Sequence, residues 1–276
     1  IEHEGRWLKD SPVKEGVYTT SNMRIGEMGQ YDGTIKDGKF HANGKYQERN
    51  MKNDVVYAYD GEYNAGLKSG NGREKIAASN ELYIGDFLQD QRHGFGQLTY
   101  TYDDDKPKYE YQGGFQEGKK SGKGHEKHYS QSNKKIIQSY QGDYANGLYD
   151  GSGVLEQGGS TYQGEFRAGK KFGSGVLKHS DGSSYSGSFD NDKYSGEGTL
   201  VFSDGSSYTG TWSNGQKNGL GKWTSKEGIV LHEGSFVDDQ PSLVGEYYGQ
   251  HISEDGSVYL GHWLDGREHG KGERRT

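Results

Sequence analysis

The residues best placed for metal chemistry in this 276-residue sequence are the pair His125 and His128, with Glu126 between them, and the acidic run 103–105. The histidine pair has one intervening residue too few for the zinc-protease motif, and an i, i+3 pair in an extended strand points to opposite faces. The acidic run lacks the glycine and the terminal glutamate of a calcium-binding loop. We therefore expect neither a metal nor another cofactor.

Phosphate binding and nucleophilic catalysis are also disfavoured. Gly-x-Gly pairs recur along the chain, as at Gly173 and Gly175, but no third glycine or helix accompanies them to present N–H groups to a phosphate. No set of serine, histidine and acid stands out above the background. The net charge of −7 offers no basic face for a nucleic-acid backbone. We therefore expect a protein that is not an enzyme and that does not bind nucleic acid.

Two lysine pairs, Lys119 with Lys120 and Lys170 with Lys171, occupy the same place after a glycine. Aligned along one edge, they would contact anionic lipid at about 1 kcal/mol per residue near a membrane surface. The alternative is that they are solvated loop lysines, which the negative net charge favours. Membrane lipid is therefore a secondary candidate partner.

The composition sets limits on how these residues are positioned. Only 29% of residues are hydrophobic, too few for an aliphatic core of the usual kind, yet 22 Tyr, 9 Phe and 4 Trp are more aromatics than disordered chains carry. The absence of Cys excludes disulfides and cysteine-based zinc sites. No apolar run approaches the roughly 18 residues of a membrane span. A soluble protein with an aromatic core is expected.

An internal repeat with the template Y-x-G-x-[FWY]-x-x-G-x-x-x-G-x-G accounts for these aromatics, and its positions are numbered here from the leading Tyr. It is clearest from Tyr162 to Gly175. Some copies are degenerate, such as the one that carries Ala42 at the twelfth position. The eleven copies begin at His3, Tyr31, Tyr59, Tyr83, Tyr111, Tyr140, Tyr162, Tyr185, Tyr208, His232 and Tyr259.

The spacing of the copies predicts one continuous array over residues 1–276, with longer, less regular copies in 1–139 and mostly regular copies in 140–276. The extra length falls in segments such as 97–110 and 125–139. These are either longer hairpins between repeats or loops that contact a partner.

Each copy predicts one β-hairpin. The first, third and fifth positions share a face of an extended strand, so that face is the core, with a neighbouring aromatic ring lying over each glycine. The eighth-position glycine, as in Asn146-Gly147, is a hairpin-turn signal. The predicted fold is all-β: an elongated single antiparallel sheet of tandem hairpins, forming a twisted half-pipe or rod. Bends are expected where Asp replaces the turn glycine, at Asp10, Asp90, Asp192 and Asp239.

The candidate binding residues lie on the aromatic face, which the single sheet would leave exposed as a groove that serves structure or partner binding. They are the first- and fifth-position rings of the better copies: Tyr59, Tyr63, Tyr83, Phe87, Tyr111, Phe115, Tyr140, Tyr144, Tyr162, Phe166, Tyr185, Phe189, Tyr208, Trp212, Tyr259 and Trp263.

This template, in tandem at about 23 residues, resembles the MORN (membrane occupation and recognition nexus) repeat. The resemblance implies a solenoid of hairpins with an aromatic groove. It also implies kinship with scaffolds in axonemal radial spokes, cytoskeletal collars and junctional membrane tethers. Departures from the pattern are the weak copies at His3 and His232.

We therefore expect a non-catalytic structural scaffold in the cytoplasm, in a cytoskeletal assembly or a ciliary axoneme, that holds partner polypeptides or associates with itself. Two alternatives remain open. One is a peripheral membrane tether that binds phosphoinositides through Lys119, Lys120, Lys170 and Lys171. The other is a targeting segment of a larger enzyme.

Overall fold

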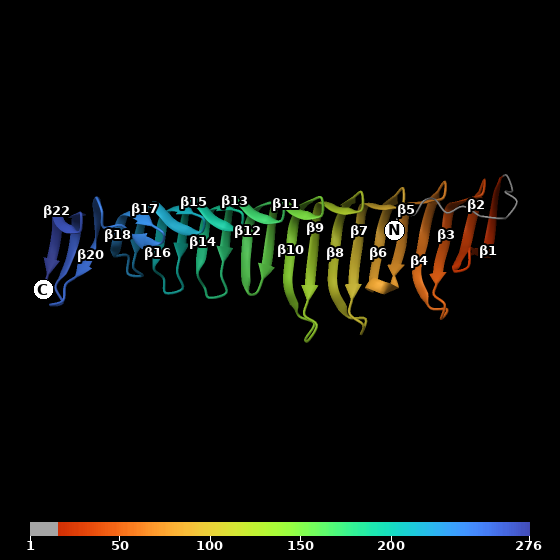
Figure 1. Ribbon diagram of the computed structural model, residues 1–276, viewed down its shortest axis with the longest axis horizontal. Coiled ribbons are helices and arrows are strands. Elements are labelled where there is room, and N and C mark those ends of the chain that lie inside the picture. Colours follow the sequence, from red (N-terminus) through yellow and green to blue (C-terminus); the bar gives the residue numbers. More distant parts are fainter. Residues whose placement is uncertain (1–15) are drawn as a thin grey trace. The chain divides into compact units, whose positions relative to one another are not determined.

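The computed structural model describes residues 16–276, so the copy that begins at His3, with Asp10, lies outside the described residues. Within 16–276 the protein is all-β apart from one 3₁₀ turn, and 22 strands form an open antiparallel sheet in hairpin order that does not close into a barrel (Figure 1). The predicted fold class is confirmed. The chain divides into two compact units, Ile1–Leu148 and Tyr149–Thr276, which are described separately.

The elements of the first unit pair with their neighbours in the chain from β1 to β10. They are β1 (Val17–Ile25), β2 (Gly29–Lys36), β3 (Lys39–Arg49), β4 (Val55–Asn64), β5 (Leu67–Ile76), η1 (Ala77–Ser79), β6 (Glu81–Leu88), β7 (Gln91–Thr101), β8 (Pro107–Gln116), β9 (Lys119–Tyr129) and β10 (Ile136–Ala145).

The strands of the second unit also follow hairpin order, except that β18 pairs with both β19 and β20. They are β11 (Leu148–Gln157), β12 (Ser160–Arg167), β13 (Lys170–Lys178), β14 (Ser184–Asp190), β15 (Lys193–Val201), β16 (Ser207–Ser213), β17 (Gln216–Thr224), β18 (Val230–Val237), β19 (Gln240–Pro241), β20 (Glu246–Ile252), β21 (Val258–Leu264) and β22 (Arg267–Arg275).

The turn at the eighth position has the left-handed backbone that the sequence predicts. Asn146 and Gly147 have φ values of 52° and 86°, as a two-residue type I′ hairpin turn requires. Asp90, Asp192 and Asp239 keep the same geometry, with φ between 67° and 71°. Asp tolerates the left-handed region and keeps the turn, and bending of the sheet at these residues stays a prediction.

The twelfth-position glycine makes a β-bulge. In the hairpin of β14 and β15, Gly187 lies opposite Gly198, but Ser188 lies opposite Ser195, so two residues of β15 are bulged out. Gly196, at the twelfth position, takes a left-handed φ of 58° there. Such bulges need an extra residue in this conformation, which glycine adopts without strain.

The core is a layer of tyrosine rings on glycine. The Tyr185 ring covers Gly187, two residues on in its own strand, and Gly198 on the partner strand; a Cβ atom at Gly187 would lie only 2.6 Å from Tyr185 Oη. The hydroxyl donates a hydrogen bond of 3.0 Å to the carbonyl of Ser188, beside the bulge. The expectation that a neighbouring ring covers each glycine is corrected, because the ring belongs to the same repeat.

Rings of successive repeats meet edge to face. Tyr59 packs against Tyr63 of its own strand at 5.0 Å and against Phe87 of the next repeat at 5.1 Å, with interplanar angles of 75° and 90°. In the second unit Tyr185 repeats this pattern with Phe189 and Trp212. Edge-to-face pairs add about 0.5–1.5 kcal/mol each beyond burial, so each repeat stabilises its neighbour.

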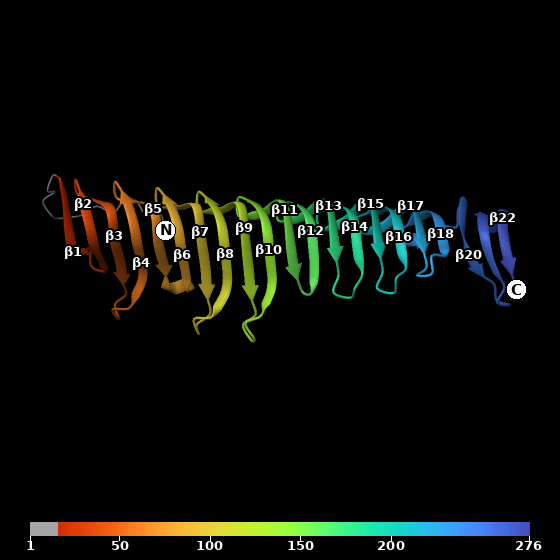
Figure 2. The ribbon, with the colours of Figure 1, turned by 180° about the vertical axis from the view of Figure 1, so that it is seen from behind.

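The longer segments of the first unit are extended hairpin ends. The loops after β3, β7 and β9 project beyond the other turns at one edge of the sheet (Figure 2). Tyr102 donates a hydrogen bond of 2.7 Å to the carbonyl of Tyr129, and the ammonium of Lys134 lies 4.1 Å from the Tyr102 ring. Two successive loops therefore support each other; partner contact by these loops stays a prediction.

Candidate functional site

All sixteen predicted groove aromatics are buried, with at most 8% of each residue exposed. The leading tyrosines are the most enclosed: Tyr83, Tyr140, Tyr185 and Tyr208 show no exposed surface. They form the core, as the sequence predicts, but the expectation of an exposed aromatic row is wrong. Seven leading tyrosines have the sheet below the ring and a further side chain above it: Tyr31, Tyr59, Tyr83, Tyr111, Tyr162, Tyr185 and Tyr208.

That covering side chain comes from the tenth position, which sequence reasoning missed. Phe40 stacks on Tyr31 at 3.9 Å and 6°, and Tyr194 stacks on Tyr185 at 3.7 Å and 11°. The register explains this placement, because the tenth position lies directly opposite the fifth, as Tyr194 lies opposite Phe189. Cross-strand partners share a face of the sheet, so the tenth position must face the core.

In five copies the tenth-position residue is a cation over the tyrosine ring. The Lys Nζ or Arg Cζ atom lies 4.8–5.7 Å from the ring centroid. A cation over an aromatic face contributes about 0.5–2 kcal/mol, depending on how far it is desolvated. The pairs are Lys68 with Tyr59, Arg92 with Tyr83, Lys120 with Tyr111, Lys171 with Tyr162 and Lys217 with Tyr208.

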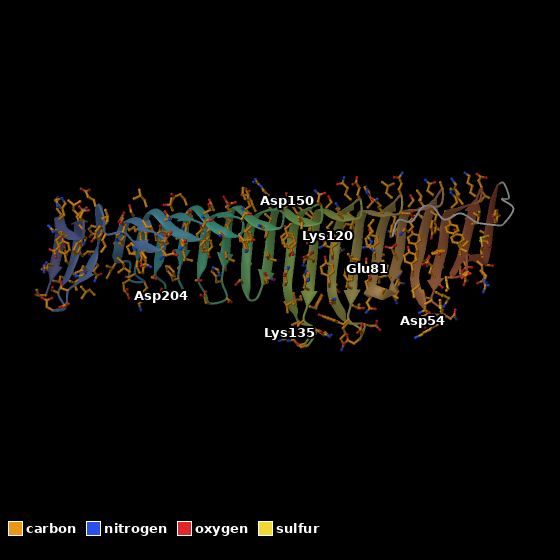
Figure 3. All side chains as sticks on the ribbon, in the orientation of Figure 1. Asp54, Glu81, Lys120, Lys135, Asp150 and Asp204 are labelled. Atoms are coloured by element: carbon orange, nitrogen blue, oxygen red, sulfur yellow. The ribbon has the colours of Figure 1, made fainter. Side chains whose placement is uncertain are left out.

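The two lysine pairs of the sequence are therefore split between faces. Lys119 and Lys170 are exposed, whereas Lys120 and Lys171 turn towards the core, because neighbouring strand residues alternate in direction. Lys120 pairs with the buried carboxylate of Glu126, and Figure 3 shows it over the strands and away from the loop edge. Lys171 lies 3.6 Å from Asp192. Their role in binding lipid stays a prediction.

The sixteenth position adds buried acids to the first unit. Glu74 accepts hydrogen bonds from Lys68 at 2.5 Å and from Arg92 at 2.9 Å, and Arg92 also pairs with Glu81. Burial alone would raise the pKa of Glu74, but Lys68 and Arg92 more than offset this and hold the pKa below its ordinary value. The four charges form one compact, internally neutralised cluster.

A second buried acid, Glu126, explains the motif that first suggested metal chemistry. Glu126 contacts Lys120, accepts a hydrogen bond of 2.9 Å from Tyr109 Oη and lies 3.2 Å from His128 Nε2. His125 falls on the opposite side of β9. Within residues 16–276, no group of three or more His, Asp or Glu side chains is arranged to hold a metal ion.

Lys217, like Lys68 and Lys120, lies among three aromatic rings. Its Nζ lies 5.4 Å from Phe202, 5.5 Å from Tyr208 and 5.2 Å from Trp223. Burial lowers the pKa of Lys217, against the opposing effect of Asp239. The sheet can therefore hold an ammonium group among three rings.

Comparison with protein-family models matches the MORN repeat nine times, at residues 31–47, 59–77, 83–101, 111–132, 140–158, 162–184, 185–207, 208–230 and 259–275. The copy that begins at His232 is not matched, and the count of eleven is approximately right. Comparison with curated proteins gave no match. Among the described residues, no helix is both long and apolar enough to cross a membrane.

Proposed function

Because the chain belongs to the MORN repeat family, a non-catalytic module that binds proteins or membranes, we propose that it is a structural scaffold that holds partner polypeptides. The observation that carries the proposal is the variety of side chains at the tenth position. One backbone frame, repeated along the sheet, presents an aromatic ring at Tyr194, a cation at Lys217 and an acid at Glu268. A fixed frame with varied side chains is suited to reading an extended partner.

We place this scaffold in the cytoplasm, in a cytoskeletal or axonemal assembly, and we include other copies of the chain among its partners. The support is the resemblance of the array to the cytoskeletal scaffolds of its family. A catalytic domain elsewhere in the full reading frame would instead make the array a targeting segment of an enzyme.

Affinity purification of the tagged protein from its native cell, followed by mass spectrometry, tests the proposal. We expect cytoskeletal or axonemal proteins in fixed ratio. Lys171→Met should weaken their retention, because it replaces a covering cation, whereas Lys170→Met, on the outer face, should not. Failure to retain any polypeptide or to self-associate would contradict the scaffold.

The exposure of Lys119 and Lys170 favours a membrane tether as the second candidate. Flotation with vesicles that contain phosphoinositide tests it. The tether requires that Lys119→Glu with Lys170→Glu abolish flotation. Binding that survives substitution of all four lysines, Lys120 and Lys171 included, would eliminate lipid recognition through these residues.

A further inference from the structure

The copy that begins at His232 departs from the hairpin register of the other copies. In a regular copy the first position lies opposite the sixteenth, as Tyr185 lies opposite Leu200. Here His232 lies opposite Gly249, at the eighteenth position. Two extra residues therefore lie in the second half of the hairpin, where β19 is short and residues 242–245 belong to no strand.

The shift places an extra ring where the others have glycine. Tyr247 lies against Gly234, with its Cβ atom only 2.7 Å from where a Cβ of that glycine would stand. The Tyr247 ring stacks on His232 at 4.9 Å and runs parallel to Trp263 at 5.9 Å and 2°. Three rings thus stand in a row that no regular copy contains.

A pocket of about 480 Å³ opens beside this row, entirely within the second unit. Its wall includes the rings of Trp223, His232, Tyr247, His251 and Trp263. Glu268 also lines it and pairs with Arg274. A concave site that combines aromatic rings with a few polar groups such as Gln250, Ser253 and Glu268 is a common form of binding pocket.

The tenth position of this copy supplies neither an aromatic ring nor a cation. The residue there is Pro241, opposite Phe236. The neighbouring copy shows that the sheet can hold an ammonium group beside these rings. Lys217 Nζ lies 5.2 Å from Trp223, a ring that also forms part of the pocket wall. In five copies the array fills the tenth position with its own cation.

We propose that the pocket binds a lysine side chain of a partner polypeptide, with its ammonium group over the rings of Tyr247 and Trp263 and towards Glu268. The partner's lysine supplies to this copy the kind of cation that Lys217 and its equivalents supply in five other copies. The inference rests on the proposed scaffold function and names the chemistry by which the scaffold reads its partner.

Indole N–H signals in an NMR titration of the full chain report on the site. Trp263 Nε1 donates to the carbonyl of Gly249 at 3.1 Å, and Trp212 Nε1, away from the pocket, donates to Gly198 at 3.2 Å. Trp223 Nε1 is buried without a hydrogen-bond partner in the described part of the chain. Nα-acetyl-lysine N-methylamide should shift the signals of Trp223 and Trp263 and leave that of Trp212 in place.

The norleucine analogue, which lacks the charge, should bind about 3- to 10-fold more weakly, as the loss of a cation over aromatic rings predicts. Equal binding of both analogues, or no shift at Trp223 and Trp263, would overturn the proposal.

Two variants separate the site from the fold. Pro241→Lys supplies an internal cation at the tenth position and should abolish the shifts in a folded protein, whereas Val237→Lys, an exposed residue of β18, should leave them unchanged. Shifts that persist in Pro241→Lys contradict the inference. If Pro241→Lys and the unaltered chain retained partner proteins equally, the scaffold function would stand, but the pocket would have no part in it. If the unaltered chain retained no partner protein but still bound the lysine analogue, the pocket would stand and the scaffold function would not.

Discussion

At the scale of single residues, the fold depends on pairs of glycines that lie under a tyrosine ring. A Cβ atom at Gly187 would lie 2.5 Å from the Cα of Gly198 and 2.6 Å from both Tyr185 Oη and the carbonyl of Glu197. Two of these neighbours are backbone atoms, which cannot rotate away. A methyl group there must separate the strands or lift the ring.

We therefore predict that Gly187→Ala lowers the free energy of unfolding by about 1–3 kcal/mol, as overpacking of a core does. Ser186→Ala, which changes the exposed residue next to it, is the control and should be close to neutral. Urea denaturation followed by circular dichroism measures both. A Gly187→Ala midpoint equal to that of the control would mean that the ring is not held against the sheet.

Ala42 is the residue-scale exception at the bulge, where it adopts a left-handed φ of 51°. That conformation costs an L-residue about 1–2 kcal/mol, whereas glycine adopts it freely. Ala42→Gly should therefore raise the free energy of unfolding, measured by urea denaturation, by up to about 1 kcal/mol once the greater backbone entropy of glycine is subtracted. Ala58→Gly, in the extended strand β4, should lower it by about 0.5–1 kcal/mol. Shifts of the same sign in both variants would contradict the assignment of strain to Ala42.

At the scale of the hairpin, most of the element was predictable because its key positions repeat the same residue type. A glycine recurs at the turn, as at Gly147, and beneath the leading tyrosine, as at Gly164 under Tyr162. Each of these positions has one physical reason to be glycine. The tenth position was not found, because its residue type varies, as from Phe40 to Lys68 to Tyr194, and no single residue type marks it. The turn itself held the signal, since a two-residue turn at positions seven and eight places positions five and ten opposite each other.

The pocket beside Tyr247 was not predictable for a different reason. Its origin is a register shift between β18 and β20, and the sequence shows only that the copy beginning at His232 is weak. The residue that lies opposite Gly234 depends on which residues of the second half of the hairpin stay unpaired with β18. Pairing geometry decides this, and no residue type marks it in advance.

The buried acid Glu74, in strand β5, also predicts that the stability of the first unit depends on pH. Its pKa is held below the ordinary value by Lys68 and Arg92, so the folded first unit releases this proton more readily than the unfolded chain. The resulting stability is present above the ordinary pKa of Glu, about 4.3, and is lost as the pH falls below it. Glu74→Gln should lower the stability at pH 7 by about 3 kcal/mol, because two buried cations lose a partner, and should flatten the decline towards pH 3.

Urea midpoints from pH 7 to pH 3 measure this effect. Glu197→Gln, which alters an exposed acid in the second unit, should keep both the stability and the slope of the unaltered chain. An equally steep acid transition in Glu74→Gln would assign the pH dependence to other groups.

At the scale of the whole molecule, each unit repeats one arrangement in which a tyrosine ring is enclosed by its own hairpin and the next. Such an array is stabilised through nearest neighbours, so a change that acts on every leading tyrosine acts on all hairpins at once. Alkaline pH is such a change. Burial raises the pKa of Tyr31, Tyr162, Tyr185 and Tyr208 to about 12, and it raises those of Tyr59, Tyr83 and Tyr111 further.

The unfolded chain ionises its tyrosines near pH 10, about two units below the folded value, so folding binds protons at alkaline pH. The stability from these phenols is complete below pH 10 and declines as the pH rises towards 12. We predict one cooperative transition in this window, with tyrosinate absorbance at 295 nm rising together with the loss of β-sheet circular dichroism. Since ionisation requires opening of the ring layer, refolding on return to pH 8 should restore both signals. A complete rise of the tyrosinate absorbance near pH 10 with the β-sheet signal intact would show that the leading rings are open to water, and it would contradict the enclosed layer on which the array depends.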